Sequence, residues 1–285
     1  MSIRRAMFAG SWYPADAGSC ERQIQAFLKE AGEREVPLQN PTAGIVPHAG
    51  WYFSGSIACD VIHRLAESGP ADVVLLFGMH LRPSDPRFIM AGGRWETPFG
   101  LLEVDEDLAR ELLEHFEFRV ETPENFVQDN TIELQLPFVK YFHPEARIVP
   151  VGVPPVAESL EVGKTAARLA ARDGKRLRVI GSTDLTHYGS NYGFTPAGRG
   201  GEALRWVRDE NDRRVIDAML AMAPERVIEE GVSRHNACCA GAAATAIAAS
   251  REAGATRAHE VAYATSYDKS PGESFVGYVG VVFGN

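Results

Sequence analysis

The sequence predicts one α/β domain, residues 1–285, built on buried parallel strands. Strand-like apolar runs alternate along the chain with helix-like amphipathic segments, and there is no internal repeat or linker. The run ADVVLLF at residues 71–77 has the continuous apolar character of a parallel strand that is covered on both faces. Several such runs end in polar or histidine-containing turns, as strands do at the ligand-binding edge of an α/β sheet.

Each element follows from its local pattern. Residues 1–15 form an irregular arm, because aromatic residues, glycine and proline follow one another there without a period. Helical spacing of apolar residues predicts helices at 19–31, 56–66, 106–116, 130–142 (bent at Pro137), 156–171, 201–222, 224–230 and 237–253. Short apolar runs predict strands at 43–46, 71–77, 87–90, 146–153, 177–181, 259–266 and 274–283.

Composition excludes several classes of protein. The net charge of −9 and the lack of a basic block argue against a nucleic-acid partner, because phosphates are bound by clustered Lys and Arg. No apolar run approaches the length of a membrane span, and the N-terminal segment lacks the apolar core of a signal peptide. Four unevenly placed cysteines do not make a disulfide framework. We therefore expect a cytoplasmic protein.

Three histidines, His48, His80 and His187, each follow a predicted strand at its carboxyl end. A right-handed crossover between the first two strands predicts that His48 and His80 lie on neighbouring strand ends. Any one of the three could be a hydrogen-bonded structural histidine. Together they favour a transition-metal site, because imidazole is the commonest protein ligand for zinc, copper and iron.

Cys239 is a further candidate ligand. If Asn236 caps the helix at 237–253, Cys239 occupies its third position, where the helix dipole stabilises a thiolate. Such a thiolate is a metal ligand or a nucleophile, and the alternative is a small packing residue. Its neighbour Cys238 should point elsewhere. Three roles are open for Asp184: accepting a proton, orienting a ligand, or capping a turn.

Three reaction classes would use these groups: metal-dependent oxygen activation, metal-assisted hydrolysis, and cysteine nucleophile catalysis with a histidine base. A triad of Ser182, Asp184 and His187 is disfavoured, because residues so close in sequence seldom reach the required geometry. The chain has no phosphate-binding loop and no dinucleotide fingerprint.

Several segments together resemble the Memo-like family, also named AmmeMemoRadiSam system protein B. They are RRAMFAGSWYPAD, VPHAGWYFSG, LLFGMH, IELQLPF, STDLTHYG, NACCAG and SPGESFVGYVGVVF, and they extend from about residue 3 to residue 283. That family is similar in fold to the class III extradiol ring-cleaving dioxygenases, which use non-haem iron. The resemblance implies an α/β sandwich around a mixed, largely parallel sheet.

The resemblance also implies a site. It assigns His48, His80 and Cys239 to the metal, and Asp184 and His187 to catalysis in the same pocket. The implied metal is iron or copper, with zinc also open, and the implied activity is that of a dioxygenase-like oxidoreductase acting on an unknown small substrate. Expected partners are a small-molecule or peptide ligand and a radical SAM protein.

Two departures from the family pattern leave an alternative open. The segment that ends in His80 reads FGMH, where the family usually has a Gly-Pro-polar-His turn. Asn130 stands where the family commonly has histidine. Asparagine neither titrates nor binds metal as imidazole does, although Glu133 is retained. The remaining pocket wall is expected at Trp51 and Tyr52. The alternative function is therefore a non-catalytic binding module that recognises a peptide or partner protein in the same pocket.

Overall fold

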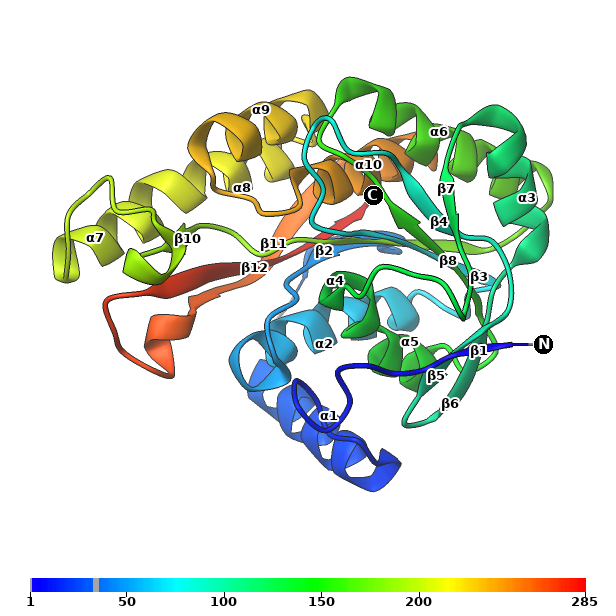
Figure 1. Cartoon of the computed structure of the whole chain (residues 1–285), viewed down its shortest axis with the longest axis horizontal. Helices are drawn as coiled ribbons and strands as arrows, with labels where there is room; N and C mark the ends of the chain where they lie inside the picture. The colour runs from blue at the N-terminus through cyan, green and yellow to red at the C-terminus, as the bar shows by residue number, and fades with distance from the viewer. Residues whose placement is uncertain (1, 33–35) are drawn as a thin grey trace.

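The core of the fold is a sheet whose centre consists of four parallel strands (Figure 1). The computed structural model describes residues 2–32 and 36–285. The four central strands lie in the order β2 (Ala43–Val46), β9 (Leu177–Ser182), β3 (Val73–Gly78) and β8 (Arg147–Gly152). They are almost entirely buried, as their apolar sequences require for strands covered on both faces.

Antiparallel pairing appears toward both edges of this sheet, so that the predicted mixed sheet is confirmed. On the side of β2 lie β12 (Phe275–Gly284), β11 (Arg257–Thr265) and β10 (His187–Tyr188). On the side of β8 lie β4 (Phe88–Met90) and β7 (Arg119–Glu121). A separate small sheet combines the N-terminal arm with a hairpin: β1 (Ile3–Arg4), β5 (Arg94–Thr97) and β6 (Gly100–Glu103).

Helices cover both faces of the large sheet, which gives the predicted sandwich (Figure 1). One layer contains α1 (Ala17–Ala31), α2 (Trp51–Glu67), α4 (Asn130–Glu133) and α5 (Leu136–Phe142). The other contains α3 (Glu106–His115), α6 (Ala157–Arg172), α7 (Gly201–Trp206), α8 (Asp212–Leu220), α9 (Pro224–Arg234) and α10 (Ala240–Glu252). Within the described part of the chain, no helix is both long enough and apolar enough to cross a membrane.

Helix α10 packs unusually close to its neighbours because its contact residues are small. It is alanine-rich and almost wholly buried. A Cβ atom added at Gly181 of β9 would lie 2.9 Å from the carbonyl oxygen of Ala242, and one added at Gly163 of α6 would lie 2.9 Å from Thr245 Cγ2. The first half of α10 is therefore packed directly against both β9 and α6.

Several helices differ from those predicted. Helix α2 begins at Trp51 instead of residue 56. Helix α10 begins at Ala240 instead of residue 237, because Asn236 is buried and its amide donates to Asn211 instead of capping the helix. The helix predicted at 201–222 contains a π-helical turn, Val207–Asn211, between α7 and α8.

Candidate metal centre

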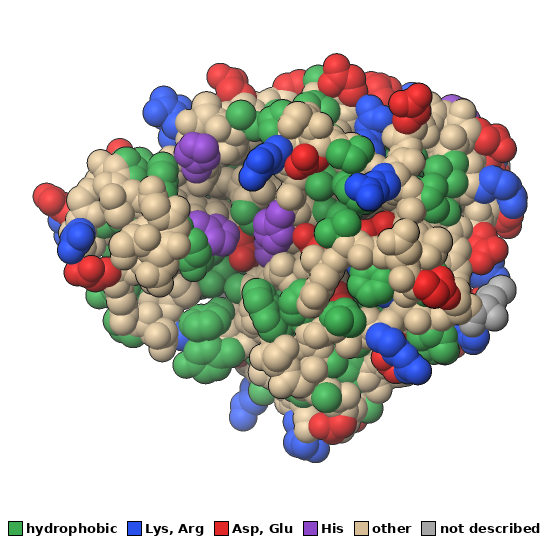
Figure 2. All heavy atoms as spheres, viewed as in Figure 1, with side chains coloured by type: hydrophobic (Ala, Val, Ile, Leu, Met, Phe, Trp, Pro, Cys, Tyr) green, Lys and Arg blue, Asp and Glu red, His purple; other side chains and the backbone are tan. Residues whose placement is uncertain are grey.

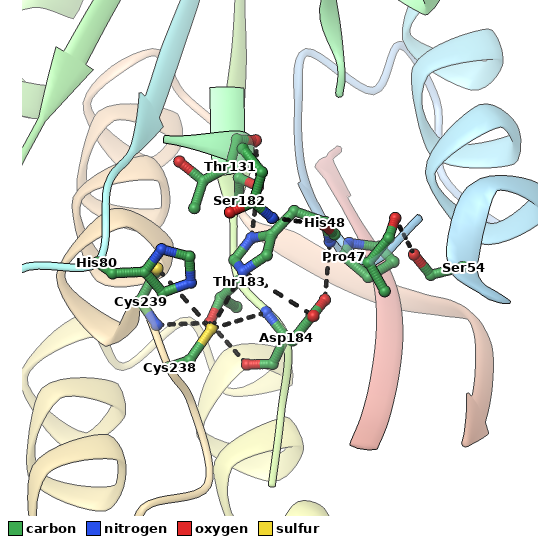
Figure 3. A network of polar contacts seen from close by, with 12 residues as sticks. Pro47, His48, Ser54, His80, Thr131, Ser182, Thr183, Asp184, Cys238 and Cys239 are labelled. Carbon is green, nitrogen blue, oxygen red and sulfur yellow. Dashed lines mark hydrogen bonds and ion pairs between the residues drawn. The ribbon is translucent and has the colours of Figure 1, made fainter. Parts of the chain in front are cut away.

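His48 and His80 meet at the carboxyl edge of the sheet, although their strands are not neighbours. The prediction of adjacent strands is wrong, because β9 lies between β2 and β3 and pairs with both. The turns after the strands nevertheless bring the imidazole rings together, with centroids 5.0 Å apart and planes at 81°. Strand β9 contributes its own last residue, Ser182, to the same site (Figure 3).

Four potential metal ligands converge at this point: His48, His80, Cys238 and Cys239 (Figure 3). One ligand atom from each lies within 4.8 Å of all the others. The two sulfur atoms are 3.8 Å apart, and Cys238 Sγ is 3.3 Å from His48 Nε2. A tetrahedral ion would place two sulfur ligands about 3.8 Å apart, and sulfur and nitrogen about 3.6 Å apart. This set, hereafter the His2Cys2 group, therefore fits a four-coordinate metal ion.

Cys238 belongs to the group, which the sequence did not predict. Because α10 starts only at Ala240, both cysteines lie in the loop before it, and both sulfur atoms turn toward the histidines. The turn after β9 fixes this loop. The Cys239 amide donates to Thr183 Oγ1 (3.0 Å), the Cys238 amide donates to the Asp184 carbonyl (3.1 Å), and the Asp184 amide donates to Cys238 Sγ (3.3 Å).

Hydrogen bonding fixes the tautomer of His48. Ser182 Oγ donates to the carbonyl of Thr131 (2.8 Å), so it can only accept from His48 Nδ1, which lies 2.9 Å away. Nδ1 therefore carries the proton. Nε2 faces Cys238 Sγ and is the ring nitrogen available to a metal ion, which would displace any proton that Nε2 shares with that sulfur atom.

A carboxylate orients His80 in the same manner. Asp129 Oδ2 accepts from His80 Nδ1 (3.0 Å) and from the His80 amide (3.2 Å). Asp129 also caps α4, by accepting from the amide of Thr131. The preceding residue, Met79, has a φ of +72° and is buried, and its amide donates to Thr131 Oγ1 (2.7 Å). An aspartate before Asn-Thr at a predicted helix start was the signal that could have identified Asp129.

The electrostatics of the group favour a thiolate on Cys238. Burial raises the pKa of this thiol, but hydrogen bonds with Cys239, His48 and His80 and the charge of His48 outweigh burial and hold its pKa well below the ordinary value. Burial and the neighbouring Cys238 raise the pKa of Cys239, which keeps its proton. Burial lowers the pKa of His80, but bonding to Asp129 and Cys238 raises it to about 10. Without a metal ion, the Cys238 thiolate is therefore paired with a protonated His80, and an ion that bound here would displace protons from the group.

Asp184 and His187 lie beside the group. Asp184 is buried, accepts from the His48 amide (2.7 Å), and has Oδ2 3.9 Å from His48 Nε2. Burial raises the pKa of Asp184, while the nearby His48 and His187 lower it less strongly. His187 Nδ1 lies 3.1 Å from the Leu185 carbonyl, to which it can only donate, so its Nε2 is a free acceptor. Its ring packs edge-on against Tyr192.

A cavity of about 620 Å³, hereafter the polar pocket, opens above the group. Figure 2 shows histidine side chains gathered around a hollow on this face. Asn130 lines the pocket and donates from Nδ2 to the carbonyl of His48 (2.9 Å), and Tyr52 lines its rim with 61% of its surface exposed. Of the predicted site residues, those that line it are His48, His80, Asp184, His187, Asn130 and Tyr52.

Trp51 and Glu133 do not lie in the pocket wall. Trp51 is the first residue of α2 and points into the core, where its ring stacks on Phe138 with centroids 4.1 Å apart. Glu133 is buried against the N-terminal arm, where it accepts from the Phe8 amide (2.7 Å) and the Tyr13 hydroxyl (3.0 Å). Both residues stabilise the packing of the arm and α2 around the site.

A buried carboxylate at the start of α8 supports the turn that carries His187. Asp212 Oδ1 accepts from the Thr186 amide (3.0 Å) and hydroxyl, and Oδ2 accepts from the Tyr263 hydroxyl (2.8 Å). Burial raises the pKa of Asp212 to about 7, although these hydrogen bonds lower it. The π-helical turn before α8 also directs the Asn211 amide at the Thr186 hydroxyl (2.9 Å).

Comparison with known proteins agrees with this architecture. The sequence profile of the family described as Memo-like protein matches residues 4–282. A MEMO1 family protein of Pyrococcus furiosus is 34% identical and covers 98% of both chains, and one of Thermococcus kodakarensis is 33% identical and covers 99% of both. The crystal structure of an uncharacterized Escherichia coli K12 protein superposes with a TM-score of 0.54 at 12% identity, covering 85% of this chain and 99% of that one. That likeness confirms the α/β fold.

Proposed function

This chain belongs to the Memo-like family, and from that premise we propose that it binds one transition-metal ion through the His2Cys2 group. The observation that carries the proposal is the convergence of two imidazoles and two sulfur atoms within 4.8 Å. Its support is the hydrogen bonding of His48 to Ser182 and of His80 to Asp129, which occupies Nδ1 in both rings and leaves Nε2 as the nitrogen available to a metal ion. Metal-binding histidines are commonly oriented by such partners.

The donor set favours a thiophilic ion. Two sulfur and two nitrogen ligands suit copper(I) or zinc, whereas isolated non-haem iron(II) prefers two histidines and a carboxylate. The nearest carboxylate to a ligand atom of His48 is Asp184, 3.9 Å away and already bonded to the His48 amide. We therefore place copper first among the redox-active ions and zinc as the redox-inactive alternative.

With copper bound, the proposed activity is that of an oxidoreductase acting on a small molecule in the polar pocket. The ion would supply one-electron redox chemistry. His187, through its Nε2, would accept a proton from a substrate hydroxyl, and Asp184 would fix the backbone of His48. The pocket, at about 620 Å³, has the size of ordinary small-molecule sites.

Metal analysis of protein purified without oxygen tests the proposal. We expect about one copper or zinc ion per chain, loss of that ion in Cys238→Ser and His48→Ala, and full retention in the control His115→Ala, which alters a histidine on α3 outside the site. X-ray absorption of the bound ion should report sulfur and nitrogen neighbours. Absence of a stoichiometric ion, or unchanged binding in Cys238→Ser, would contradict the proposal.

A second candidate function is a binding module for a peptide or partner protein, favoured by Asn130. Because this residue is an asparagine, the position supplies no imidazole for proton transfer. Its side-chain amide instead donates a hydrogen bond to the His48 carbonyl. The rim of the pocket also exposes the aromatic side chains of Trp12, Tyr52 and Tyr192, which suit a polypeptide ligand. Turnover of a catechol-like substrate that disappears in His187→Ala would exclude this candidate.

A further inference from the structure

A second cavity, of about 730 Å³, reaches the His2Cys2 group from the side of Cys238. It shares His80, His187 and Tyr192 with the polar pocket, so that the edge-on pair of His187 and Tyr192 stands between the two cavities. Cys238 lines this second cavity and does not line the polar pocket. This cavity, hereafter the apolar hollow, is a distinct approach to the same group.

The walls of the hollow are mainly hydrophobic. They come from the turn after β3, the segment after β8, the turn after β10, and the C-terminal part of α9. The apolar side chains are Leu81, Pro83, Pro155, Phe194 and Val232. Val232 is 44% exposed, which is high for a valine on a helix that otherwise buries its apolar residues. Such a wall favours a ligand with an apolar body.

The ionisable groups at the mouth of the hollow are basic. Although the chain has a net charge of −9, none of the described residues that line the hollow is an aspartate or a glutamate. Arg82 bonds to Asp85 through its backbone amide, and among the described residues its guanidinium takes part in no ion pair. The free guanidinium therefore offers two parallel N–H groups, which match a carboxylate.

His235 adds a second polar group to this mouth. It adopts a left-handed conformation, with a φ of +55°, at the C-terminal end of α9. Residues other than glycine seldom adopt this conformation, which has an energetic cost. The imidazole packs edge-on against Phe194, with centroids 5.5 Å apart, and lines the hollow. The side chain is thus held where it can donate a hydrogen bond to an anion.

We propose that the apolar hollow binds a small organic carboxylate with an apolar body. The carboxylate pairs with Arg82 and His235, and the body packs on Val232, Phe194 and Pro83. The ligand then lies beside Cys238 and His80. Its relevance to metal chemistry rests on the proposed function, whereas the binding itself rests on the walls of the hollow. The polar pocket remains available to a different molecule.

Fluorine NMR titration of the full chain with 4-fluorobenzoate tests this proposal. The neutral 4-fluorobenzamide serves as the matched probe, and both are titrated into metal-free and zinc-loaded protein. We expect the carboxylate to bind at least tenfold more tightly than the amide. Arg82→Ala should weaken carboxylate binding about tenfold, and Val232→Asp should abolish it by adding a negative charge to the wall.

Three control variants locate the binding. Tyr52→Ala alters the rim of the polar pocket only, Val120→Asp alters another exposed valine on β7, and Arg22→Ala removes an arginine of α1. All three should bind 4-fluorobenzoate within twofold of the parent chain. Equal affinity for the two probes, undetectable binding of the carboxylate, or an unchanged affinity in Arg82→Ala would overturn the proposal.

The outcome also separates this inference from the proposed function. Carboxylate binding that depends on Arg82, in protein that binds no metal stoichiometrically, would leave the inference standing and refute the metal site. Stoichiometric metal binding without carboxylate binding would refute only the inference.

Discussion

The Nδ1 atom of His48 lies 2.9 Å from Ser182 Oγ, a hydroxyl whose own hydrogen is committed to the Thr131 carbonyl. This relationship keeps a proton on Nδ1, so that Nε2 is the atom that would bind the ion of the proposed metal site. We predict that Ser182→Ala weakens metal binding about 10- to 100-fold, the usual cost of losing such a partner. Competition with a chelator of known affinity would measure the change.

The control for this variant is Ser250→Ala, which removes another buried serine hydroxyl bonded to a backbone carbonyl, near the far end of α10. It should retain the affinity of the parent chain. An equal loss in both variants would mean that general destabilisation, and not the tautomer of His48, causes the effect.

Asp212 should make the stability of the protein depend on pH. Its pKa is about 7 in the folded protein and about 3.9 in an unfolded chain. Between these values the folded state keeps a proton that the unfolded state has lost. The free energy of unfolding therefore falls as pH rises from about 4 to about 7, by up to about 1.4 kcal/mol per pH unit from this group.

Asp212→Asn removes the titrating group, so its unfolding free energy should fall less than that of the parent chain over this pH range. Urea unfolding at several pH values between 5 and 8 would measure the difference. The control Asp217→Asn, at an exposed position of the same helix, should follow the parent chain. Parallel curves for the parent chain and Asp212→Asn would contradict the raised pKa.

Cys238 should be the first cysteine to be alkylated in metal-free protein. Its side chain lines the apolar hollow, whereas Cys20 and Cys59 are wholly buried and Cys239 is 4% exposed. Mass spectrometry after brief treatment with iodoacetamide would identify the modified residue. Stoichiometric zinc should slow the reaction strongly, because a bound sulfur is a poorer nucleophile. Preferential labelling of Cys239 would contradict the structure.

Gly163 should be essential to the packing of α6 on α10. A Cβ atom here would overlap the Thr245 carbonyl of α10, which cannot move as a flexible side chain can. We predict that Gly163→Ala lowers the free energy of unfolding by about 1–3 kcal/mol, the usual cost of overpacking. The control Gly18→Ala, in α1 with ordinary contacts at 3.4 Å and beyond, should be neutral or stabilising.

The fold class could be predicted from the alternation of apolar runs and helix-like segments. A continuous apolar run is by itself evidence of a strand that is buried on both faces. The run before His80 reads as a buried strand from its sequence alone, and the helices follow from their spacing. The strand order was not encoded in this way. The placement of β9 between β2 and β3 depends on pairing between segments more than a hundred residues apart, which no local pattern records.

The site was predictable where a residue lies just beyond the end of a strand, as His48 and His80 do. It was not predictable for Cys238, because the expected N-cap at Asn236 shifted the helix by three residues. Asn236 is used elsewhere: its amide is buried and donates to the carbonyl of Asn211. The prediction of Trp51 in the pocket wall failed for a related reason, because residues 51–55 were not predicted to be part of α2.

Met79, which has a left-handed backbone conformation, links strand β8 to the proposed metal site through its side chain. The Met79 side chain occupies the space that a side chain at Gly152 of β8 would need, since an added Cβ would lie 2.9 Å from Met79 Cγ. A methyl group at Gly152 would therefore overlap the Met79 side chain and displace it. Because His80 is the next residue in the chain, we expect its position to change as well. We therefore expect Gly152→Ala to change the affinity of the proposed metal site from a neighbouring strand, without altering any proposed ligand or its hydrogen-bond partners.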